Sequence, residues 1–394
     1  MSRQSSPGAR RLRVAVPMTG RDPEDEHRSA TPLELFFDLV YVVAVALAAE
    51  RLHHALAEGV VGASIFRYTV LFFAIWWAWV NFTWFMSAYD SDDVAFRVFV
   101  FVTMTGALIF AAGVPRIFDE LDFRIGVLGY VVMRLALVTQ WIRVGRADSL
   151  RRITAHRFAI GVTACQIGWV VGAAVPALWW PAFALLAPAE LLVPVWAEAA
   201  SPTTWNREHI SERYGLFMII VLGESVLAAS LAIQSATEGD GLNGELVAII
   251  VGGLLILFSM WWLYFDRPQD QLLASTRTAF FWSYMHLPIF AAVAAVGAGL
   301  AVAIDGAAGH GELGSIGRGA AIAVPVAAYL LSLWALYLRS AHTAIGKLSG
   351  PATAVLVLAA SFVGGSVLGI GLLLATLVAL KVGLRLRSEE EIAA

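Results

Sequence analysis

Residues Tyr214–Ile233 read YGLFMIIVLGESVLAASLAI, a run that is apolar apart from small residues and one carboxylate, Glu224. A bilayer core is crossed by about 20 apolar residues, so this run predicts a transmembrane helix. A carboxylate near the centre of such a helix costs roughly 2.5–3.5 kcal/mol on insertion scales. The stretch therefore predicts an integral membrane protein in which an ionisable group at membrane depth has a partner or a task.

The composition of the whole chain agrees with that interpretation. Of 394 residues, 59% are hydrophobic and 14% charged, and the mean hydropathy is +0.73. Soluble domains carry about 25% charged residues. We therefore expect an all-α, polytopic membrane protein whose main partner is the lipid bilayer.

Other classes of protein find little support in the sequence. The net charge is −3, and no basic patch interleaved with aromatic residues suggests a nucleic-acid partner. Cys165 is the only cysteine, so neither a disulfide framework nor a thiol metal site is predicted. No cofactor is expected. Residues 1–32 are polar and arginine-rich without a signal-peptide core, and they predict a disordered cytoplasmic tail.

The apolar runs predict about twelve membrane spans. They fall at 33–53, 64–86, 94–114, 123–142, 156–175, 178–198, 211–233, 245–265, 277–303, 318–338 and 352–383. The last run has roughly 31 residues and would form a helix about 46 Å long, too long for one ordinary crossing. Gly364-Gly365 and Gly369 offer a break that divides it into two short spans.

The distribution of basic residues predicts the orientation. With the N-terminus in the cytoplasm, most of the 27 Lys and Arg residues fall on the cytoplasmic side, including Lys381, Arg385 and Arg387 of the C-terminal tail. The positive-inside rule then favours an even number of spans, with both termini cytoplasmic. Tryptophans at span ends, such as Trp76, Trp77, Trp79, Trp84, Trp179, Trp180, Trp261 and Trp262, are interpreted mostly as headgroup anchors.

Weak matches recur along the chain in the same order, at offsets of about 178 to 185 residues. Glu34-Leu35-Phe36-Phe37 corresponds to Glu212-Arg213-Tyr214-Gly215, and Trp76–Phe82 corresponds to Trp261–Asp266. Parallel repeats are common in transporters, with binding sites near the midplane. We therefore expect two pseudo-repeated six-helix halves, 33–200 and 201–384, and a cytoplasmic tail, 385–394. The alternative is chance recurrence of similar helix starts.

Glu34 and Asp38 are four residues apart and so share one helix face. Neighbouring carboxylates raise each other's proton affinity, which suits proton or cation handling. For Glu34 there is a structural alternative, because Thr31-x-x-Glu34 matches a capping box at a helix start. Asp38 lies deeper among apolar residues and is the stronger candidate for a buried functional role.

His209, Glu212 and Arg213 share a face that leads into the run containing Glu224. They are either a solvated ion pair or a cytoplasmic gate, in which Arg213 pairs with Asp38, Glu34 or Glu190. Glu208-His209-x-x-Glu212 superficially resembles a metal-ligand spacing, but it lacks the paired histidines of zinc motifs, and no metal site is expected.

Three other ionisable residues lie within predicted spans. Glu190 is flanked by Pro188 and Pro194, Arg134 is a countercharge whose partner carboxylate the sequence does not identify, and His286 precedes Pro288. Broken helices at membrane depth usually line a cavity. With Asp38 and Glu224, these groups would cost roughly ten kcal/mol or more if left unpaired. A shared internal polar network is therefore expected, although a lone His286 is equally consistent with a simple hydrogen-bonded helix contact.

Two stretches carry a family resemblance. TPLELFFDLVY (31–41) and HISERYGLFMIIVLGES (209–225) resemble the bacterial low temperature requirement protein A family, and YMHLPIF (284–290) is similar to a third stretch of it. The likeness spans about residues 28–380. It implies a polytopic inner-membrane protein without an assigned reaction. The motif positions it marks, without roles, are Glu34, Asp38, His209, Glu212, Arg213, Glu224 and His286.

We interpret the chain as a secondary transporter or permease, with ion- or substrate-binding residues among Glu34, Asp38, Arg134, Glu190, His209, Glu212, Arg213, Glu224 and His286. Glu224 and Asp38 would bind a proton, a cation or a cationic group of a small-molecule substrate. Arg213 would gate, and His286 would assist proton transfer. One alternative is a membrane-embedded enzyme acting on a lipid or isoprenoid, with Asp38 and Glu224 as acid–base groups. Another is a non-catalytic channel or envelope-stress protein whose acidic residues lock helices together.

Overall fold

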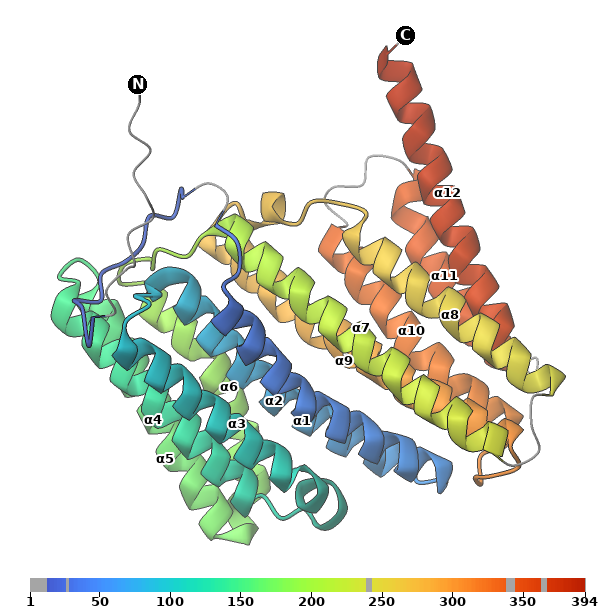
Figure 1. Ribbon diagram of the computed structural model, residues 1–394, viewed down its shortest axis with the longest axis horizontal. Helices are drawn as coiled ribbons and strands as arrows, with labels where there is room; N and C mark the ends of the chain where they lie inside the picture. The colour runs from blue at the N-terminus through green and yellow to red at the C-terminus, as the bar shows by residue number, and fades with distance from the viewer. Residues whose placement is uncertain (1–12, 26–27, 239–242, 338–343, 363–366, 394) are drawn as a thin grey trace, which may run out of the picture. The chain divides into compact units, whose positions relative to one another are not determined.

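The computed structural model describes residues 13–25, 28–238, 243–337, 344–362 and 367–393, and within them the chain is helical, with no strand. The α-helices in chain order are α1 Pro32–Ala57, α2 Val61–Tyr89, α3 Val94–Glu120, α4 Arg124–Ala147, α5 Arg152–Ala174, α6 Trp179–Glu198, α7 Arg207–Glu238, α8 Gly244–Phe265, α9 Thr276–Ala307, α10 Ser315–Tyr337, α11 Ala344–Phe362 and α12 Val367–Ala393 (Figure 1). Short 3₁₀ turns precede α6 and α9, at Pro176–Leu178 and Asp270–Leu273.

Eleven helices of the described chain are long and apolar enough to cross a membrane. The apolar part of the remaining helix, α11, is the shorter segment Lys347–Phe362. The expected division of 352–383 into two helices is confirmed, because α11 ends at Phe362 and α12 begins at Val367. Gly364-Gly365 lies outside the described residues, whereas Gly369 lies inside α12 and breaks nothing. The chain is therefore an all-α, multi-pass membrane protein; a crossing by α11 stays a prediction.

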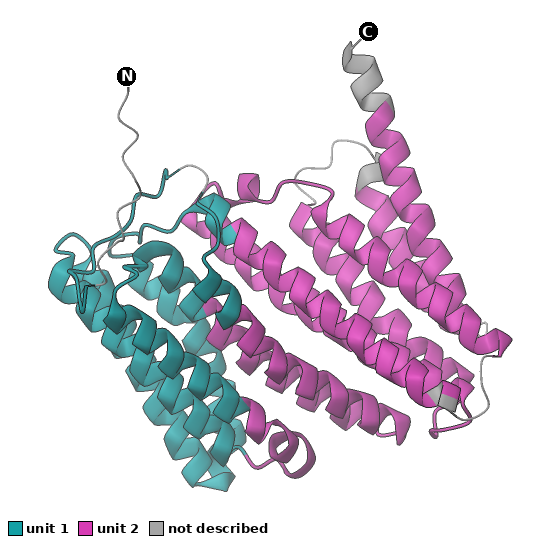
Figure 2. Ribbon diagram, viewed as in Figure 1, with its two compact units in different colours: residues 1–37, 81–110, 123–210 teal, residues 38–80, 111–122, 211–394 magenta. Residues whose placement is uncertain are grey.

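By internal contacts the chain forms two compact units (Figure 2). Unit 1 comprises residues 1–37, 81–110 and 123–210, and unit 2 comprises 38–80, 111–122 and 211–394. These units do not follow the expected boundary at residue 200. The two repeated six-helix halves stay a prediction.

In unit 1, α5 packs against both α4 and α6, and α3 meets α4 through two glycines. A Cβ added to Gly106 or Gly129 would collide with backbone atoms of the facing helix. Small residues of this kind let transmembrane helices approach closely, where dispersion contacts and interhelical hydrogen bonds stabilise them.

Part of the expected disordered tail is packed in unit 1. The backbone N–H of Val16 donates to Asp93 Oδ2 at 2.9 Å, and Met18 is 1% exposed. Arg28 is buried and donates to the carbonyl oxygens of Met86, at 3.1 Å, and Ser87. Residues 13–25 and 28–31 are thus tied to helix ends by hydrogen bonds that the polar composition did not reveal; residues 1–12 and 26–27 lie outside the described chain.

In unit 2, α9 is the most deeply buried of the apolar helices and packs against α10 and α8. The α8–α12 pair is packed backbone to backbone: a Cβ on Gly252 would strike the backbone of Val367 and Leu368, and one on Gly371 would strike the carbonyl oxygen of Gly252. This close approach fixes α12 beside α8.

The tryptophans divide into two groups. Trp261 and Trp262 are 46% and 45% exposed, as headgroup anchors require. Trp76, Trp77 and Trp79 are at most 1% exposed, so the anchor interpretation is wrong for these three. They are core residues, and Trp79 has a polar partner that explains its burial.

Candidate functional site

Unit 2 holds a buried ion pair between α1 and α7. Arg213 Nη2 donates to Asp38 Oδ1 at 2.6 Å and Arg213 Nε donates to Asp38 Oδ2 at 3.1 Å, and both side chains are 0% exposed. Trp79 Nε1 of α2 donates to the same Oδ1 at 2.7 Å. A bidentate guanidinium–carboxylate pair is among the strongest charge-assisted arrangements. The pair is neutral as a whole, which explains how both charges are tolerated inside the membrane protein.

Aromatic rings surround this pair. The Trp79 ring stacks on Phe217, with centroids 4.3 Å apart, and meets the Tyr214 ring edge-on at 4.8 Å. Phe290 of α9 lies 6.0 Å from Trp79. Such ring contacts exclude water and lower the local dielectric, so the Asp38–Arg213 attraction is stronger there than at a surface.

His286 of α9 is buried, and both of its ring nitrogens are hydrogen-bonded. Its Nδ1 is 2.7 Å from the carbonyl oxygen of Trp282, which can only accept, so Nδ1 carries the proton. Its Nε2 therefore accepts from the Tyr264 hydroxyl of α8 at 3.1 Å. The Tyr214 ring packs edge-on against the imidazole at 4.9 Å, and its hydroxyl lies 2.6 Å from Ser283 Oγ. The contacts of His286 match the helix-contact interpretation; its role in proton transfer stays a prediction.

Glu34 caps α1, as its spacing from Thr31 predicts. The Thr31 backbone N–H and hydroxyl donate to Glu34 Oε2 at 2.8 and 3.0 Å, and the Glu34 N–H donates to Thr31 Oγ1 at 3.3 Å. This reciprocal pattern is a capping box. His209 Nε2 lies 3.2 Å from Glu34 Oε1, and both side chains are at most 1% exposed. Glu34 thus combines a capping role with a buried histidine contact within unit 1.

The start of α7 is capped by Asn206. Its Oδ1 accepts from the His209 backbone N–H at 2.9 Å. Its Nδ2 donates to the carbonyl oxygens of Pro23 and Asp25 at 2.9 and 3.0 Å. The Asn206 side chain therefore caps the start of α7 and also binds the backbone of residues 23–25 by hydrogen bonds.

Glu208 and Glu212 are exposed, whereas His209 is buried. The metal-like spacing of these three residues does not bring them together. Across the described residues, no group of three or more His, Cys, Asp or Glu side chains is placed to hold a metal ion.

Arg134 forms a buried ion pair with Glu190. Arg134 Nη2 is 3.1 Å from Glu190 Oε2, and both side chains are at most 3% exposed. Trp169 Nε1 donates to Glu190 Oε1 at 3.3 Å, and the guanidinium lies over the Tyr130 ring, 5.3 Å from its centroid. These contacts link α4, α5 and α6 within unit 1.

Glu224 differs from the other intramembrane charges. It is half-buried in the middle of α7, and among the described residues it has no hydrogen-bond or ion-pair partner. Its electrostatic neighbour is Glu50 of α1, a carboxylate of the same sign. The hydroxyl of the neighbouring Ser225 donates to the carbonyl oxygens of Val221 and Val293, at 3.2 and 3.0 Å, and not to the Glu224 carboxylate. Gly223 faces open space, and the close approach of α7 to α9 lies at Ser225, where a Cβ added to Gly297 would stand 2.9 Å from the Ser225 Cα.

Within each unit the contacts bring predicted residues together in pairs, and one shared network stays a prediction. Unit 1 holds Glu34 with His209 and Arg134 with Glu190; unit 2 holds Asp38 with Arg213, and His286 with Tyr264. Sequence reasoning missed Trp79, Tyr214, Tyr264, Ser283 and Glu50. Tyr214 had a signal, since it directly follows Arg213 in the same motif.

Eleven apolar helices and charge pairs buried between them define the class: a multi-pass α-helical membrane protein with ionisable groups inside its helix bundle. Residues 29–383 match the family model described as bacterial low temperature requirement A protein (LtrA), and the chain belongs to that family. An uncharacterized protein of Rhizobium meliloti (strain 1021) is 26% identical over 300 residues, which cover 68% of this chain and 68% of the relative.

Proposed function

We propose that the protein is a secondary transporter or permease of the bacterial inner membrane, and that Glu224 binds the coupling proton or monovalent cation. The observation that carries the proposal is the state of Glu224: a half-buried carboxylate in mid-helix whose electrostatic neighbour is another carboxylate, Glu50. A structural carboxylate at that depth is normally paired. Two acidic groups within electrostatic range are instead stabilised by a proton or cation between them, which is how an ion site operates.

The Asp38–Arg213 pair has a different part in this proposal. With both charges fully buried and both carboxylate oxygens engaged, Asp38 is satisfied without an added ion. We assign the pair, with His286 and Tyr214 beside it, to a gate or lock whose breaking accompanies a conformational change. Removal of one partner from such a pair is expensive, so it gives a two-state element.

The membrane-enzyme alternative gains less support from the cavities. An apolar cavity of about 400 Å³ is lined by residues of α1, α2, α9 and α10, including Leu52, Phe72 and Pro288. It is large enough for part of a lipid chain. Its described lining holds no Asp, Glu, His or Lys side chain to act as acid or base. Asp38 and Glu224, the proposed acid–base groups, are not among the residues that line it.

The test is ion flux through the full-length protein reconstituted in liposomes. Proton, sodium and potassium gradients are imposed in turn, and flux is followed with a pH-sensitive dye and ion-selective electrodes. Wild type is compared with Glu224→Gln, which keeps the side-chain shape and removes the charge. The matched control is Glu245→Gln, an exposed carboxylate at the start of α8.

We expect flux in wild type and in Glu245→Gln, and its loss in a folded Glu224→Gln variant. Glu50→Gln should alter the pH at which flux is half-maximal, because it removes the repulsion acting on Glu224. Full flux in Glu224→Gln would remove Glu224 from the ion path. Absence of flux in wild type under every gradient would refute ion coupling and favour the locked, non-transporting alternative.

A further inference from the structure

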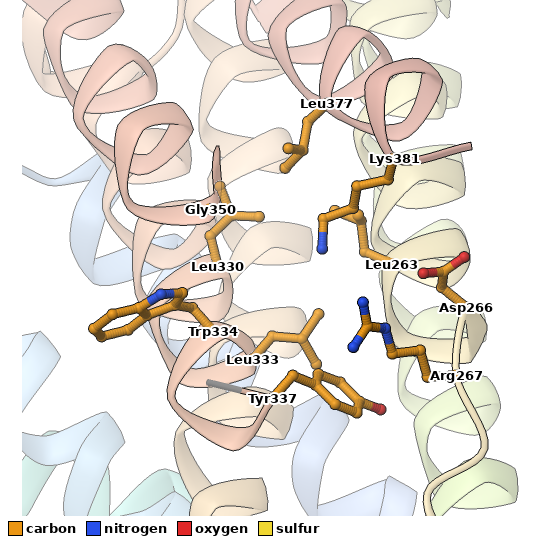
Figure 3. Close-up of a pocket in the computed structure, with 10 residues that line it drawn as sticks. All are labelled: Leu263, Asp266, Arg267, Leu330, Leu333, Trp334, Tyr337, Gly350, Leu377 and Lys381. Atoms are coloured by element: carbon orange, nitrogen blue, oxygen red, sulfur yellow. The ribbon is translucent and has the colours of Figure 1, made fainter. Parts of the chain in front are cut away.

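A small cavity of mixed polar and apolar lining lies in unit 2 where the end of α8, the end of α10, the start of α11 and the middle of α12 come together (Figure 3). Its volume is about 40 Å³. A buried water needs roughly 10–15 Å³ on this measure, so the cavity has room for about three waters or one compact oxyanion. It is separate from Asp38, Arg213 and Glu224, none of which lines it.

Positive charge dominates this cavity. Figure 3 shows the terminal nitrogen of Lys381 and the guanidinium of Arg267 directed into the same space, with the carboxylate of Asp266 turned away from it. Asp266 has an ion-pair partner that does not line the cavity: Arg385 Nη1 lies 3.8 Å from its Oδ1 and donates to its carbonyl oxygen at 3.1 Å. Among the described residues, Lys381 Nζ has no hydrogen-bond or ion-pair partner; its charge is repelled by Arg267 and attracted by Asp266, so the three groups leave a net positive charge at the cavity.

The remaining lining offers a further hydrogen-bond donor, the hydroxyl of Tyr337. Tyr337 Oη is buried and finds no hydrogen-bond partner within the described chain, while the Arg267 guanidinium lies 5.9 Å from the centre of the Tyr337 ring. Trp334 is fixed, because its Nε1 donates to the Lys347 carbonyl oxygen at 2.6 Å. Gly350 lies beside it, and a Cβ there would be in ordinary van der Waals contact with the Trp334 side chain, at 3.5 Å.

From these contacts we infer that the cavity binds a phosphate group. Its oxygens would accept from the Lys381 ammonium, the Arg267 guanidinium and the Tyr337 hydroxyl, and its negative charge would relieve the repulsion between the two cations. The cavity lies at helix ends beside Trp334 and Tyr337, residue types that mark the headgroup level of a bilayer. Basic pockets between transmembrane helices at that level bind the headgroups of anionic lipids. The phosphate therefore comes either from an anionic phospholipid or from inorganic phosphate.

Native mass spectrometry of the full-length protein, released from nanodiscs, tests the inference. The discs contain phosphatidylglycerol or phosphatidylcholine, and a second series adds inorganic phosphate as a competitor. Lys381→Gln and Tyr337→Phe are compared with wild type and with Arg277→Gln. Arg277 is an exposed cation in the first turn of α9, so its loss matches the charge change of Lys381→Gln without touching the cavity.

Wild type and Arg277→Gln should retain phosphatidylglycerol in preference to phosphatidylcholine. Lys381→Gln should weaken retention by about tenfold or more, since hydrogen bonds to charged groups are the stronger kind, and Tyr337→Phe by less. Retention unaffected by inorganic phosphate identifies the lipid headgroup as the source, and displacement by it identifies free phosphate. Equal loss in Lys381→Gln and Arg277→Gln, or no preference for either probe in wild type, would overturn the inference. If Lys381→Gln does not fold, Tyr337→Phe alone must still weaken retention.

Discussion

Breaking the Asp38–Arg213 pair should destabilise the protein strongly, and removing both charges should destabilise it less than the sum of the two single changes. The perturbations are Asp38→Asn, Arg213→Met and the double variant. Asp38→Asn keeps an oxygen for Trp79 Nε1, now 2.7 Å from Asp38 Oδ1, so the change isolates the charge. Arg213 would then be a fully buried cation without its counterion.

The magnitude follows from the geometry of the pair. Two hydrogen bonds of 2.6 and 3.1 Å join side chains that are 0% exposed, so solvent screens them little. Breaking a buried pair by removing one partner costs about 3–5 kcal/mol. In the double variant no uncompensated charge remains, and we expect a coupling energy of about 2–3 kcal/mol between the two positions.

The assay is equilibrium unfolding in mixed micelles with a rising fraction of sodium dodecyl sulfate, followed by far-UV circular dichroism. Glu245→Gln is the control, because Glu245 is an exposed carboxylate at the start of α8 and its loss should change stability by no more than about 0.5 kcal/mol. The reasoning fails if Asp38→Asn behaves like this control. It fails equally if the two single effects simply add in the double variant.

Two more predictions concern single hydrogen-bonded groups. Tyr264→Phe removes the donor 3.1 Å from His286 Nε2 and should cost about 1–3 kcal/mol in the same unfolding assay; an unchanged midpoint would contradict the assigned contact. Burial acts to raise the pKa of Asp93, but hydrogen bonds from Val16, Phe96 and Arg143 outweigh it and lower that pKa below its usual value. A carboxyl with a depressed folded-state pKa stabilises above its unfolded value of about 3.9 and loses that stabilisation as the pH falls through the folded value. The melting-temperature gap between wild type and Asp93→Asn should therefore be widest near neutral pH and close on acidification; a constant gap would exclude ionisation of Asp93 as its cause.

Local features of the chain were predictable because they depend on neighbours in sequence. Apolar runs of sufficient length identified the membrane helices, and the spacing of Thr31 and Glu34 identified the capping box. The excess length of 352–383 predicted that it contains two helices, as α11 and α12 show. Each of these depends on contacts within one or two turns.

The pairing of buried charges depends on tertiary packing, and the sequence could only narrow the choice. Arg213 had three candidate partners and pairs with Asp38, which lies 175 residues away. Arg134 was recognised as a countercharge, but the choice of Glu190 depends on how α4, α5 and α6 pack. Trp79 shows a different limit, because the same residue type serves as a headgroup anchor or as a buried donor. Only the position of Asp38 beside it decides between them.

The glycine contacts between α8 and α12 constrain how this protein can move. Gly252 and Gly371 bring two backbones so close that neither helix can slide past the other without atoms overlapping. Sliding motions in packed proteins require side chains that yield, and here the opposing surfaces are main chain. We therefore expect α8 and α12 to move together as one rigid body in any conformational change of unit 2. The bending that such a change needs has to fall elsewhere in unit 2, where Pro288 of α9 and Pro325 of α10 already interrupt helical hydrogen bonding.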